Sequence, residues 1–490
     1  MLQKLFLNPK NKFSTVKNLT RNNAYKKLSE QDISHFQKIL GSNHVKQQEI
    51  QQYNNDWMNK YKGNSELVLF PTSTQELSQI LKYCNLNKLA VVPQSGNTGL
   101  VGGSVPVFDE IIVNLQKMNK IINFDENSTV LTVEGGVILE EMNNYLKDYQ
   151  CEIPWDLGAK GSCLIGGNIS TNAGGKYYVK YGPLRANILG LEVVLPNGEV
   201  MDLQSQIRKD NTGIDLKQLF IGSEGILGII TKANILCSKL DNSRNLLYVN
   251  CSSYNDIIEV YKKAKKTLNK NLAAIEWMDA WSFNAVMETM THINNPFNKK
   301  AEIDKDYFVL IEINSNHAMQ ELEDLLFEEL QTVSGFKDAI KAQNETQFTE
   351  IWEIRETVGL ASSKKSKYQF KYDISLDIKL MEKLTQDIRK KLENFDTEVV
   401  GYGHIGDSNL HINIILKDES QKEQVANIVE PYIFEYLQKV NGSISAEHGL
   451  GLMKAQYLHL QKPQIAIDQM KQLKNIFDPQ HILNPYKCLP

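Results

Sequence analysis

The chain has 490 residues, of which 42% are hydrophobic and 23% are charged. Both fractions are near the average for globular proteins, which excludes a disordered, collagen-like or coiled-coil chain. Single hydrophobic cores stop growing at roughly 250 to 300 residues, so we expect two or three domains. No apolar run reaches the roughly 18 residues that a membrane-spanning helix needs, so we expect no transmembrane segment.

The first 29 residues differ in charge from the rest of the chain. They contain seven basic side chains and no acidic one, although the net charge of the whole chain is -4. The acidic remainder argues against binding of nucleic acid, whose phosphates require a basic surface. A basic start with a short apolar stretch around Leu5 is typical of a mitochondrial transit peptide and not of a secretory signal. We therefore interpret residues 1–29 as a transit peptide, with a basic disordered tail as the alternative.

The six cysteines are scattered and include no CxxC pair. This distribution is typical of a protein in a reducing compartment and not of a disulfide framework. We expect six free thiols, none of them a catalytic nucleophile.

Glycine is concentrated in three short segments, 94–103, 158–175 and 222–228, which hold 13 of the 29 glycines. Glycine permits positive φ and lets the backbone approach a ligand closely, at an entropic cost. The first segment lies between an apolar run and a strand-like run. Besides its successive backbone N–H groups, it offers the side-chain donors Ser95, Asn97 and Thr98. This pattern indicates a loop that cradles a pyrophosphate, with a tight turn as the alternative.

The second segment, taken as residues 157–175, has few charges and no clear helix or strand period. We expect a buried or ligand-covered loop, whose backbone a large heterocyclic cofactor would satisfy. The third, residues 220–231, is expected to be a glycine turn that leads into a strand. Residues 401–406 have the spacing GxGxxG, but the strand-like run 410–416 follows them. A dinucleotide-binding fingerprint must open a helix, so a Rossmann site is rejected.

The second half of the chain has a different pattern. From about residue 244, strand-like runs such as 246–249 and 307–311 alternate with amphipathic helices. In residues 381–392 apolar side chains recur at helical spacing. These features predict an antiparallel sheet backed by helices.

A candidate metal site lies in residues 404–413. Residues 406–409 favour a turn, which would place His404 and His411 on neighbouring strands, with Asn413 on the same face as His411. Two imidazoles and one carboxylate make a metal site with room for a substrate, although a lone histidine pair is more often part of a core or surface. Glu447, after the strand-like residues 443–444, is the candidate carboxylate, and it would place His448 beside the metal.

The three glycine-rich segments together resemble the FAD-binding domain of the vanillyl-alcohol oxidase superfamily of flavoproteins. The similarity extends from about residue 50 to the C-terminus and is most specific over residues 92–110, 156–175 and 208–231. It implies an α+β protein with a two-part FAD-binding domain and a cap domain, an antiparallel sheet backed by helices that binds substrate and metal. The implied boundaries are 50–243 for the FAD-binding domain, 244–462 for the cap and 463–490 for a C-terminal return to the FAD-binding domain.

The resemblance also implies which residues contact FAD. In the first segment these are Gln94, Ser95, Gly96, Asn97, Thr98, Gly99, Gly102, Gly103 and Ser104. In the second they are Leu157, Gly158, Ser162, Gly166, Gly167, Ile169, Thr171, Asn172, Ala173 and Gly174. The remaining implied contacts are Glu224, Gly225, Gly228, Ile230 and Asn484. Members that bind FAD covalently often have a histidine in the diphosphate loop; residues 94–97 have none, so we expect noncovalent FAD.

The family pattern assigns roles in the second half as well. It implies zinc as the metal bound by His404, His411 and Glu447, while the residues themselves leave manganese or iron open. His448 would be the base. Substrate contacts carry over to Arg355, Lys371 and Asn413. The family has a hydroxyl residue four positions after its arginine, where this chain has Gly359.

The implied activity is that of an FAD- and metal-dependent D-2-hydroxy acid dehydrogenase in the mitochondrial matrix. The substrate would be D-2-hydroxyglutarate, oxidised to 2-oxoglutarate, and the electron acceptor would be electron-transfer flavoprotein. Oxidation of D-lactate is an alternative, because the histidines and Glu447 are common to both. A flavin-binding subunit without dehydrogenase activity and an alkyl-transferring synthase are further alternatives. The sequence leaves open the substrate range, the transit cleavage site and the oligomeric state, including a homodimer.

Overall fold

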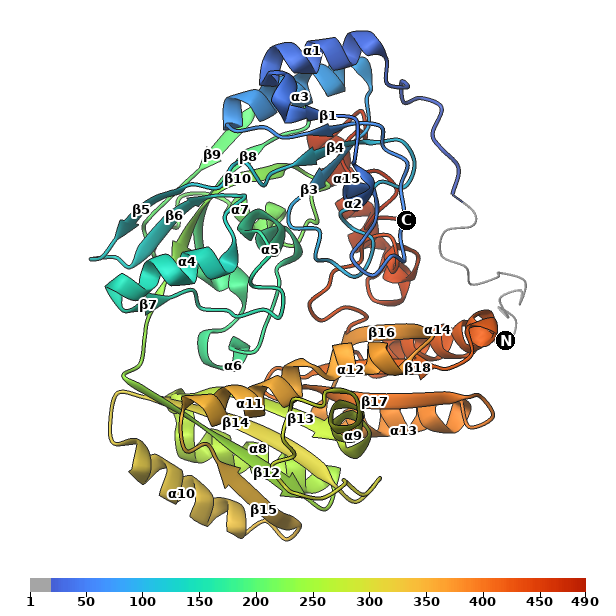
Figure 1. Ribbon diagram of the computed structural model, residues 1–490. Helices are drawn as coiled ribbons and strands as arrows, with labels where there is room; N and C mark the ends of the chain where they lie inside the picture. Colours follow the sequence, from blue (N-terminus) through green and yellow to red (C-terminus); the bar gives the residue numbers. More distant parts are fainter. Residues whose placement is uncertain (1–18) are drawn as a thin grey trace.

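The computed structural model describes residues 19–490, which form two bodies stacked on each other (Figure 1). The upper body in Figure 1 contains the blue to green first half of the chain and the red C-terminal segment. The lower body contains the green to orange second half. The upper body corresponds to the expected FAD-binding domain, and the lower body corresponds to the expected cap.

The first part of the FAD-binding domain is a four-stranded sheet of order β1-β2-β4-β3. Its strands are β1 (Val45–Lys46), β2 (Val68–Leu69), β3 (Val91–Gln94) and β4 (Ile111–Asn114). Strands β2, β4 and β3 are parallel to one another and almost fully buried, as expected for continuous Val/Ile/Leu runs. Its helices are α1 (Glu30–Leu40), α2 (Gln51–Asn54) and α3 (Thr74–Asn87).

The second part is a five-stranded antiparallel sheet of order β5-β6-β10-β8-β9. Its strands are β5 (Ile121–Asp125), β6 (Val130–Glu134), β8 (Ile188–Val194), β9 (Val200–Leu203) and β10 (Ile229–Leu236). The associated helices are α4 (Leu139–Leu146), α5 (Ile165–Thr171), α6 (Tyr178–Tyr181) and α7 (Lys217–Phe220). A two-stranded ribbon, β7 (Cys151–Glu152) with β11 (Ser238–Lys239), completes this part.

The cap is built on a seven-stranded antiparallel sheet of order β15-β12-β14-β13-β17-β18-β16. The strands are β12 (Ser243–Cys251), β13 (Leu272–Asp279), β14 (Tyr307–Ser315), β15 (Phe336–Lys341), β16 (Tyr368–Ser375), β17 (Thr397–His404) and β18 (Asn409–Leu416). Helices contribute to a core on each face of this sheet, so the cap has three layers. Helices α8 (Tyr254–Leu268), α10 (Met319–Gln331), α13 (Met381–Lys391) and α14 (Lys422–Lys439) pack on one face. Helices α9 (Ala280–Thr289), α11 (Glu345–Glu356) and α12 (Val358–Lys365) pack on the other.

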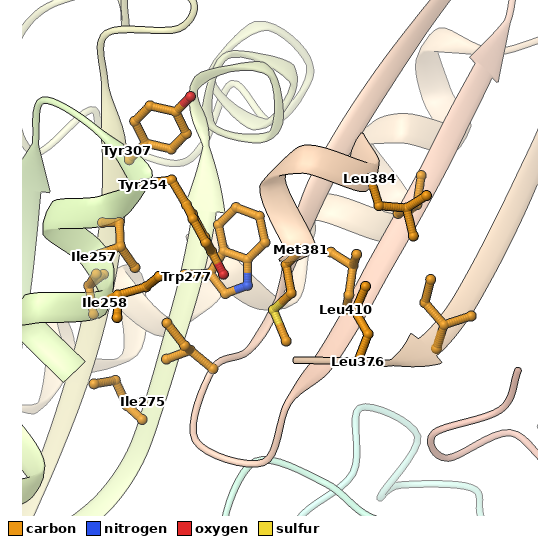
Figure 2. Close-up of a cluster of buried hydrophobic side chains, with 14 of the residues drawn as sticks. Tyr254, Ile257, Ile258, Ile275, Trp277, Tyr307, Leu376, Met381, Leu384 and Leu410 are labelled. Carbon is orange, nitrogen blue, oxygen red and sulfur yellow. The ribbon is translucent and has the colours of Figure 1, made fainter. Parts of the chain in front are cut away.

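The larger cap core joins side chains from distant parts of the chain (Figure 2). Trp277 of β13 is fully buried and packs edge-on against Tyr254 of α8, with ring centroids 4.8 Å apart. Met381 and Leu384 of α13 lie in the same cluster as Leu410 of β18. The side of β18 opposite to its histidine is thereby fixed in the core.

The C-terminal segment returns to the FAD-binding domain after α15 (Gln464–Phe477), as Figure 1 shows. Leu483 is fully buried and forms a parallel bridge with Val91 of β3. Lys487 is also buried, and its ammonium group donates to Gly103 O at 3.0 Å and Val105 O at 2.6 Å. The C-terminal segment therefore holds the end of the first glycine-rich segment in place through these hydrogen bonds.

Most of the expected elements are present. Strand β12 includes the run 246–249, β14 includes 307–311, and α13 covers the helical repeat that begins at residue 381. The GxGxxG sequence begins inside β17 and is followed by β18, which confirms that it opens no helix. The six cysteines, all within the described residues, are free. Among residues 19–490 no helix is long and apolar enough to cross a membrane.

Two expectations about local structure were wrong. Residues 157–175 are not loop throughout, because α5 forms within them. This helix has only seven residues, and two of them are glycines. It is too short, and has too few apolar side chains, to show a hydrophobic period. The residues 443–444 form no strand; Ser443 makes only an isolated bridge to Ser375 at the end of β16.

Most of the predicted transit peptide, residues 1–18, lies outside the described residues. The described remainder, residues 19–29, packs on the FAD-binding domain. Arg21 Nε is 2.5 Å from Asp109 Oδ1, and the buried Tyr25 donates its hydroxyl to His481 O at 2.6 Å. The predicted transit peptide, residues 1–29, would include this packed segment.

We predict that Leu483→Ala lowers the stability of the FAD-binding domain by about 2 to 5 kcal/mol, because it leaves a cavity at a fully buried position. Denaturant unfolding followed by flavin release measures this loss. Leu86→Ala, at a position 75% exposed on α3, is the control and should change stability by less than about 0.5 kcal/mol. Equal effects of the two substitutions would contradict the supporting role of the C-terminal segment.

Candidate active site

An open cavity with about 140 Å³ of space for water-sized molecules lies in the FAD-binding domain, on the side that faces the cap. All three glycine-rich segments contribute to its wall, and His448 lines it from the cap side. The residues that line it are Pro93, Ser95, Gly96, Asn97, Thr98, Gly99, Val101, Gly103, Ser104, Leu115, Leu164, Gly166, Gly167, Asn168, Ser170, Thr171, Glu224, Gly225, Gly228, Ile229, Ile230 and His448.

The first two segments approach each other so closely that only glycine fits between them. A Cβ on Gly96 would lie 2.2 Å from Ser162 O, and a Cβ on Gly167 would lie 2.9 Å from Ser95 Cβ. Asn168 Oδ1 is buried in this wall and has no hydrogen-bond partner among the described residues. A closely packed backbone wall with an unpaired acceptor is suited to a flat polar cofactor such as FAD.

Several residues expected to contact FAD do not line the cavity. They are Gln94, Gly102, Leu157, Gly158, Ser162, Ile169, Asn172, Ala173, Gly174 and Asn484. Some have structural roles instead. Gln94 Nε2 donates to Tyr53 O and Ser104 O at 2.9 Å each, and Asn172 ends α5 in the left-handed conformation. Asn484 Nδ2 donates to Gly103 O and Glu224 O, so it joins two segments of the wall.

The two predicted histidines meet above this cavity. The register pairs Tyr402 of β17 with His411 of β18, and the turn between the strands brings His404 next to them. His404, His411 and Glu447 each present a ligand atom within 4.8 Å of the others. His404 Nε2 is 3.8 Å from Glu447 Oε1, which also accepts Gly175 N–H at 2.7 Å. Two imidazoles and a carboxylate at these separations suit a divalent metal such as zinc.

Each histidine has a buried carboxylate behind it. Glu276 of β13 is the register partner of His404, and its Oε1 lies 2.5 Å from His404 Nδ1. Asp373 of β16 is the register partner of His411, and its Oδ1 lies 3.8 Å from His411 Nδ1. Carboxylates in this position orient imidazole ligands and make them more basic. The Nε2 atoms of both histidines therefore remain available to a metal ion between the histidines and Glu447.

The two imidazoles differ in their proton affinity. Burial lowers the pKa of His404, but its pairing with Glu276 outweighs burial and raises the pKa to about 9. Burial lowers the pKa of His411 well below its usual value, although Asp373 opposes this shift. His411 is therefore neutral near pH 7, which is the form that binds metals, whereas an ion would have to displace the proton of His404.

The loop that carries Glu447 and His448 is fixed by Asp373. Its Oδ2 accepts the N–H groups of Glu447 and His448 at 2.8 and 2.9 Å, and its Oδ1 accepts Asn409 Nδ2 at 2.8 Å. Burial raises the pKa of Asp373, but the neighbouring basic side chains, His448 and Lys454 among them, and the hydrogen bond from the Glu447 N–H outweigh burial and hold the pKa below its usual range. His448 Nδ1 lies 3.6 Å from the same Oδ2.

The expected substrate contacts lie on one side of the histidines. Arg355 of α11 stacks over the Tyr402 ring at 4.7 Å, and its Nη2 lies 2.7 Å from Glu276 Oε2. Arg355 Nε is buried and has no hydrogen-bond partner among the described residues. Asn413 Nδ2 donates to the Tyr402 hydroxyl at 3.0 Å. These groups form a buried polar wall with a donor left over for an anion.

Lys371 of β16 extends this wall, because the register places it opposite Asn413. Its Nζ lies 5.5 Å from the ring centroid of Trp57, which belongs to the FAD-binding domain. Burial lowers the pKa of Lys371. A Cβ on Gly359 would lie 3.6 Å from both Lys371 Nζ and the Tyr402 hydroxyl. A hydroxyl side chain at this position, which the family resemblance implies, would therefore lie beside Lys371, and Gly359 cannot supply its hydrogen bond.

Sequence reasoning did not find Glu276, Asp373 or Tyr402 in these roles. Glu276 and Asp373 are acidic residues inside largely apolar strands, and this pattern could have marked them as functional candidates. The histidines that they contact could not be predicted, because those contacts depend on pairing between strands that are far apart in the sequence. The expected residues Arg355, Lys371, Asn413, His404, His411, Glu447 and His448 do gather in one region.

Two family models match the chain. The one described as FAD linked oxidases, C-terminal domain, matches residues 240–488, and the one described as FAD binding domain matches residues 65–204. A mitochondrial D-2-hydroxyglutarate dehydrogenase from Arabidopsis thaliana is 44% identical over 96% of this chain and 84% of that protein. A D-2-hydroxyglutarate–pyruvate transhydrogenase from Saccharomyces cerevisiae is 38% identical over 96% of each chain. The chain belongs to the FAD-linked oxidase family.

Solved structures agree on the fold of this FAD-linked oxidase. A p-cresol methylhydroxylase structure has a TM-score of 0.75 at 16% identity, covering 94% of this chain and 96% of that one. The expected fold class is confirmed, as is the class of enzyme, an FAD-dependent dehydrogenase. The FAD binding domain model covers the first two of the glycine-rich segments that line the cavity.

We predict that Gly96→Ala reduces the affinity for FAD at least about 10-fold, because its Cβ would force apart the Gly96 and Ser162 backbones. Flavin absorbance per mole of purified polypeptide, followed by FAD titration, measures this effect. Gly161→Ala is the control, since Gly161 is not among the expected FAD contacts and a Cβ there would meet only the flexible end of the Glu140 side chain, at 3.3 Å. Undiminished flavin binding by Gly96→Ala would show that the two segments can separate without affecting the cofactor.

Proposed function

We propose that this protein oxidises D-2-hydroxyglutarate to 2-oxoglutarate, with FAD and a divalent metal, zinc in the first place, as cofactors. The observation that carries the proposal is the convergence of His404, His411 and Glu447 beside His448, on the rim of the FAD cavity. The name of the Arabidopsis relative supports the choice of substrate. The metal ligands remain a proposal, supported by the donor set and by the carboxylates behind both histidines.

Bound FAD would supply the two-electron acceptor, and the metal would lower the pKa of the substrate hydroxyl. His448 would accept the hydroxyl proton. Its ring lines the cavity, and its Nδ1 faces Asp373, which leaves Nε2 for the substrate. The buried Asp373 carboxylate would stabilise the imidazolium that forms, as expected for a carboxylate beside a general base.

The substrate has a carboxylate at each end, and the site offers two cationic groups. Arg355, held between Tyr402 and Glu276 and with a free Nε, would bind the carboxylate next to the reacting carbon. Lys371 pairs with Asn413, two residues along β18 from His411 and on the same face of the sheet. It would bind the distal carboxylate. Asn413 would position the Tyr402 hydroxyl between them.

The remaining parts of the proposal concern the setting of the enzyme. FAD is bound noncovalently, because residues 94–97 contain no histidine. Electron-transfer flavoprotein is the acceptor that the family resemblance suggests. The basic start of the chain and the mitochondrial names of relatives from Arabidopsis thaliana and Danio rerio support a mitochondrial matrix location.

Anaerobic flavin bleaching with a panel of D- and L-2-hydroxy acids tests the proposal. We expect D-2-hydroxyglutarate to bleach the flavin fastest and the L-acids to have no effect. If no D-2-hydroxy acid bleaches the flavin of the metal-loaded protein, the proposed activity is wrong.

Removal of the metal should abolish turnover and leave FAD bound, because the proposed ligands all belong to the cap whereas FAD binds between the glycine-rich segments. Chelator-treated protein should stay yellow, lose its activity and recover it when zinc is added. Metal content is measured in parallel. Full activity after verified metal removal would refute the assignment of His404, His411 and Glu447.

His448→Ala should keep FAD and metal but reduce the rate of flavin reduction about 10²- to 10⁴-fold, the usual contribution of a positioned general base. Stopped-flow measurement with saturating substrate isolates this step. If metal content falls together with the rate, His448 serves to orient Glu447 and the base must be another group.

Lys371→Met should reduce the catalytic efficiency with D-2-hydroxyglutarate about 10- to 150-fold, because it removes one charge-assisted hydrogen bond worth about 1.5 to 3 kcal/mol. D-lactate lacks the distal carboxylate, so its efficiency should change far less. Steady-state kinetics with both substrates measures the difference. An equal loss for both would place Lys371 at the reacting end of the substrate.

A further inference from the structure

Glu224 is a half-buried carboxylate of the FAD-binding domain that binds the backbone of the cap. Its Oε1 accepts Leu450 N–H at 2.7 Å, and its Oε2 accepts Gly451 N–H at 2.8 Å. Both donors belong to the loop 445–453, just after the proposed metal ligand and base. Each carboxylate oxygen thus holds one of two successive N–H groups, which is a strong, charge-assisted arrangement.

The backbone of this loop is shaped to fit the carboxylate. Gly449 has φ +79°, and a Cβ there would lie 2.6 Å from Glu224 Cδ. Gly451 has φ +48°, and a Cβ there would lie 2.4 Å from Val101 O in the first glycine-rich segment. Val101 O in turn accepts the N–H groups of the next two residues of the loop. Only glycine at these two positions lets the loop lie directly on the FAD-binding domain.

Glu224 is itself held firmly in the wall of the FAD cavity. Its backbone has φ 52°, an uncommon value for a residue with a side chain. Its N–H donates to Ser170 O at 2.7 Å, and its carbonyl accepts Asn484 Nδ2 at 2.8 Å. The carboxylate therefore projects from a fixed point of the FAD-binding domain.

The loop has a matching anchor on the cap side. There Asp373 accepts the N–H groups of Glu447 and His448 through one oxygen. One carboxylate from each domain thus holds two successive N–H groups of the loop, and only Gly449 separates the pair that ends at His448 from the pair that begins at Leu450. If one anchor is lost, the other still holds its end of the loop, but the imidazole is no longer fixed relative to the FAD cavity.

We propose that Glu224 is a positioning residue that fixes the loop 445–453 to the wall of the FAD cavity and thereby sets the position of His448. The family resemblance assigns Glu224 to cofactor contact, and the positioning role goes beyond that assignment. The inference rests on the proposed role of His448 as the base. The anchoring contact itself is independent of that role.

Hydrogen exchange of the FAD-loaded, full-length protein tests the anchor directly. Glu224→Gln keeps the shape of the side chain but replaces one acceptor oxygen with an amide donor that faces an N–H group. We expect exchange at the Leu450 and Gly451 amides to become at least about 10-fold faster. Glu110→Gln is the matched control, because Glu110 is a buried glutamate of the same domain that accepts two backbone N–H groups away from the loop.

The rate of flavin reduction tests the positioning role. We expect Glu224→Gln to slow reduction by D-2-hydroxyglutarate about 10- to 100-fold, with unchanged FAD content and with KM changed less than kcat, whereas Glu110→Gln leaves both unchanged. Gly449→Ala disturbs the same contact from the loop side and should give the same pattern if Glu224→Gln is poorly folded.

Three outcomes would overturn the inference. These are unchanged exchange at Leu450 and Gly451 in Glu224→Gln, equal acceleration in Glu110→Gln, or a loss of activity fully explained by lost FAD. Failure of the proposed function is a separate result, because wild-type protein that reduces its flavin with no D-2-hydroxy acid would still show whether Glu224 protects these two amides.

Discussion

The completely buried carboxylate of Asp373 imposes the arrangement of the active site. A charge without water must be surrounded by donors, because the cost of leaving it unpaired exceeds that of most single contacts in a protein. Here the donors are the Asn409 side chain and the N–H groups of Glu447 and His448. Satisfying one charge therefore determines the path of the loop that carries the proposed ligand and the proposed base.

The antiparallel register of the cap sheet extends this control across four strands. Side chains on one face of neighbouring strands lie directly opposite each other, so β13, β17, β18 and β16 bring Glu276 to His404, Asp373 to His411 and Lys371 to Asn413. A shift of one residue in any of these pairings would turn a polar group into the core. The buried apolar residues on the opposite face of β18 prevent such a shift.

The sequence contained the parts of the site that depend on local patterns. Glycine spacing located the three segments that line the cavity, and the turn between His404 and His411 follows from residues 406–409. The helix α5 was missed because a seven-residue helix rich in small side chains has no hydrophobic period. Glu276 and Asp373 could not be assigned as partners of the histidines, since strand order in the sheet does not follow the order in the chain. The role of Glu224 depends on how two domains dock, and no local pattern encodes it.

The return of the chain to its first domain has a consequence for biosynthesis. Leu483 completes the environment of β3, and Lys487 holds the loop that contains Gly103, so the FAD-binding domain lacks essential contacts until nearly the whole chain has left the ribosome. The cap, inserted between these parts, is complete earlier and can fold first. A premature stop that removes only the last few residues would therefore harm the domain encoded at the opposite end of the gene and leave the neighbouring cap intact.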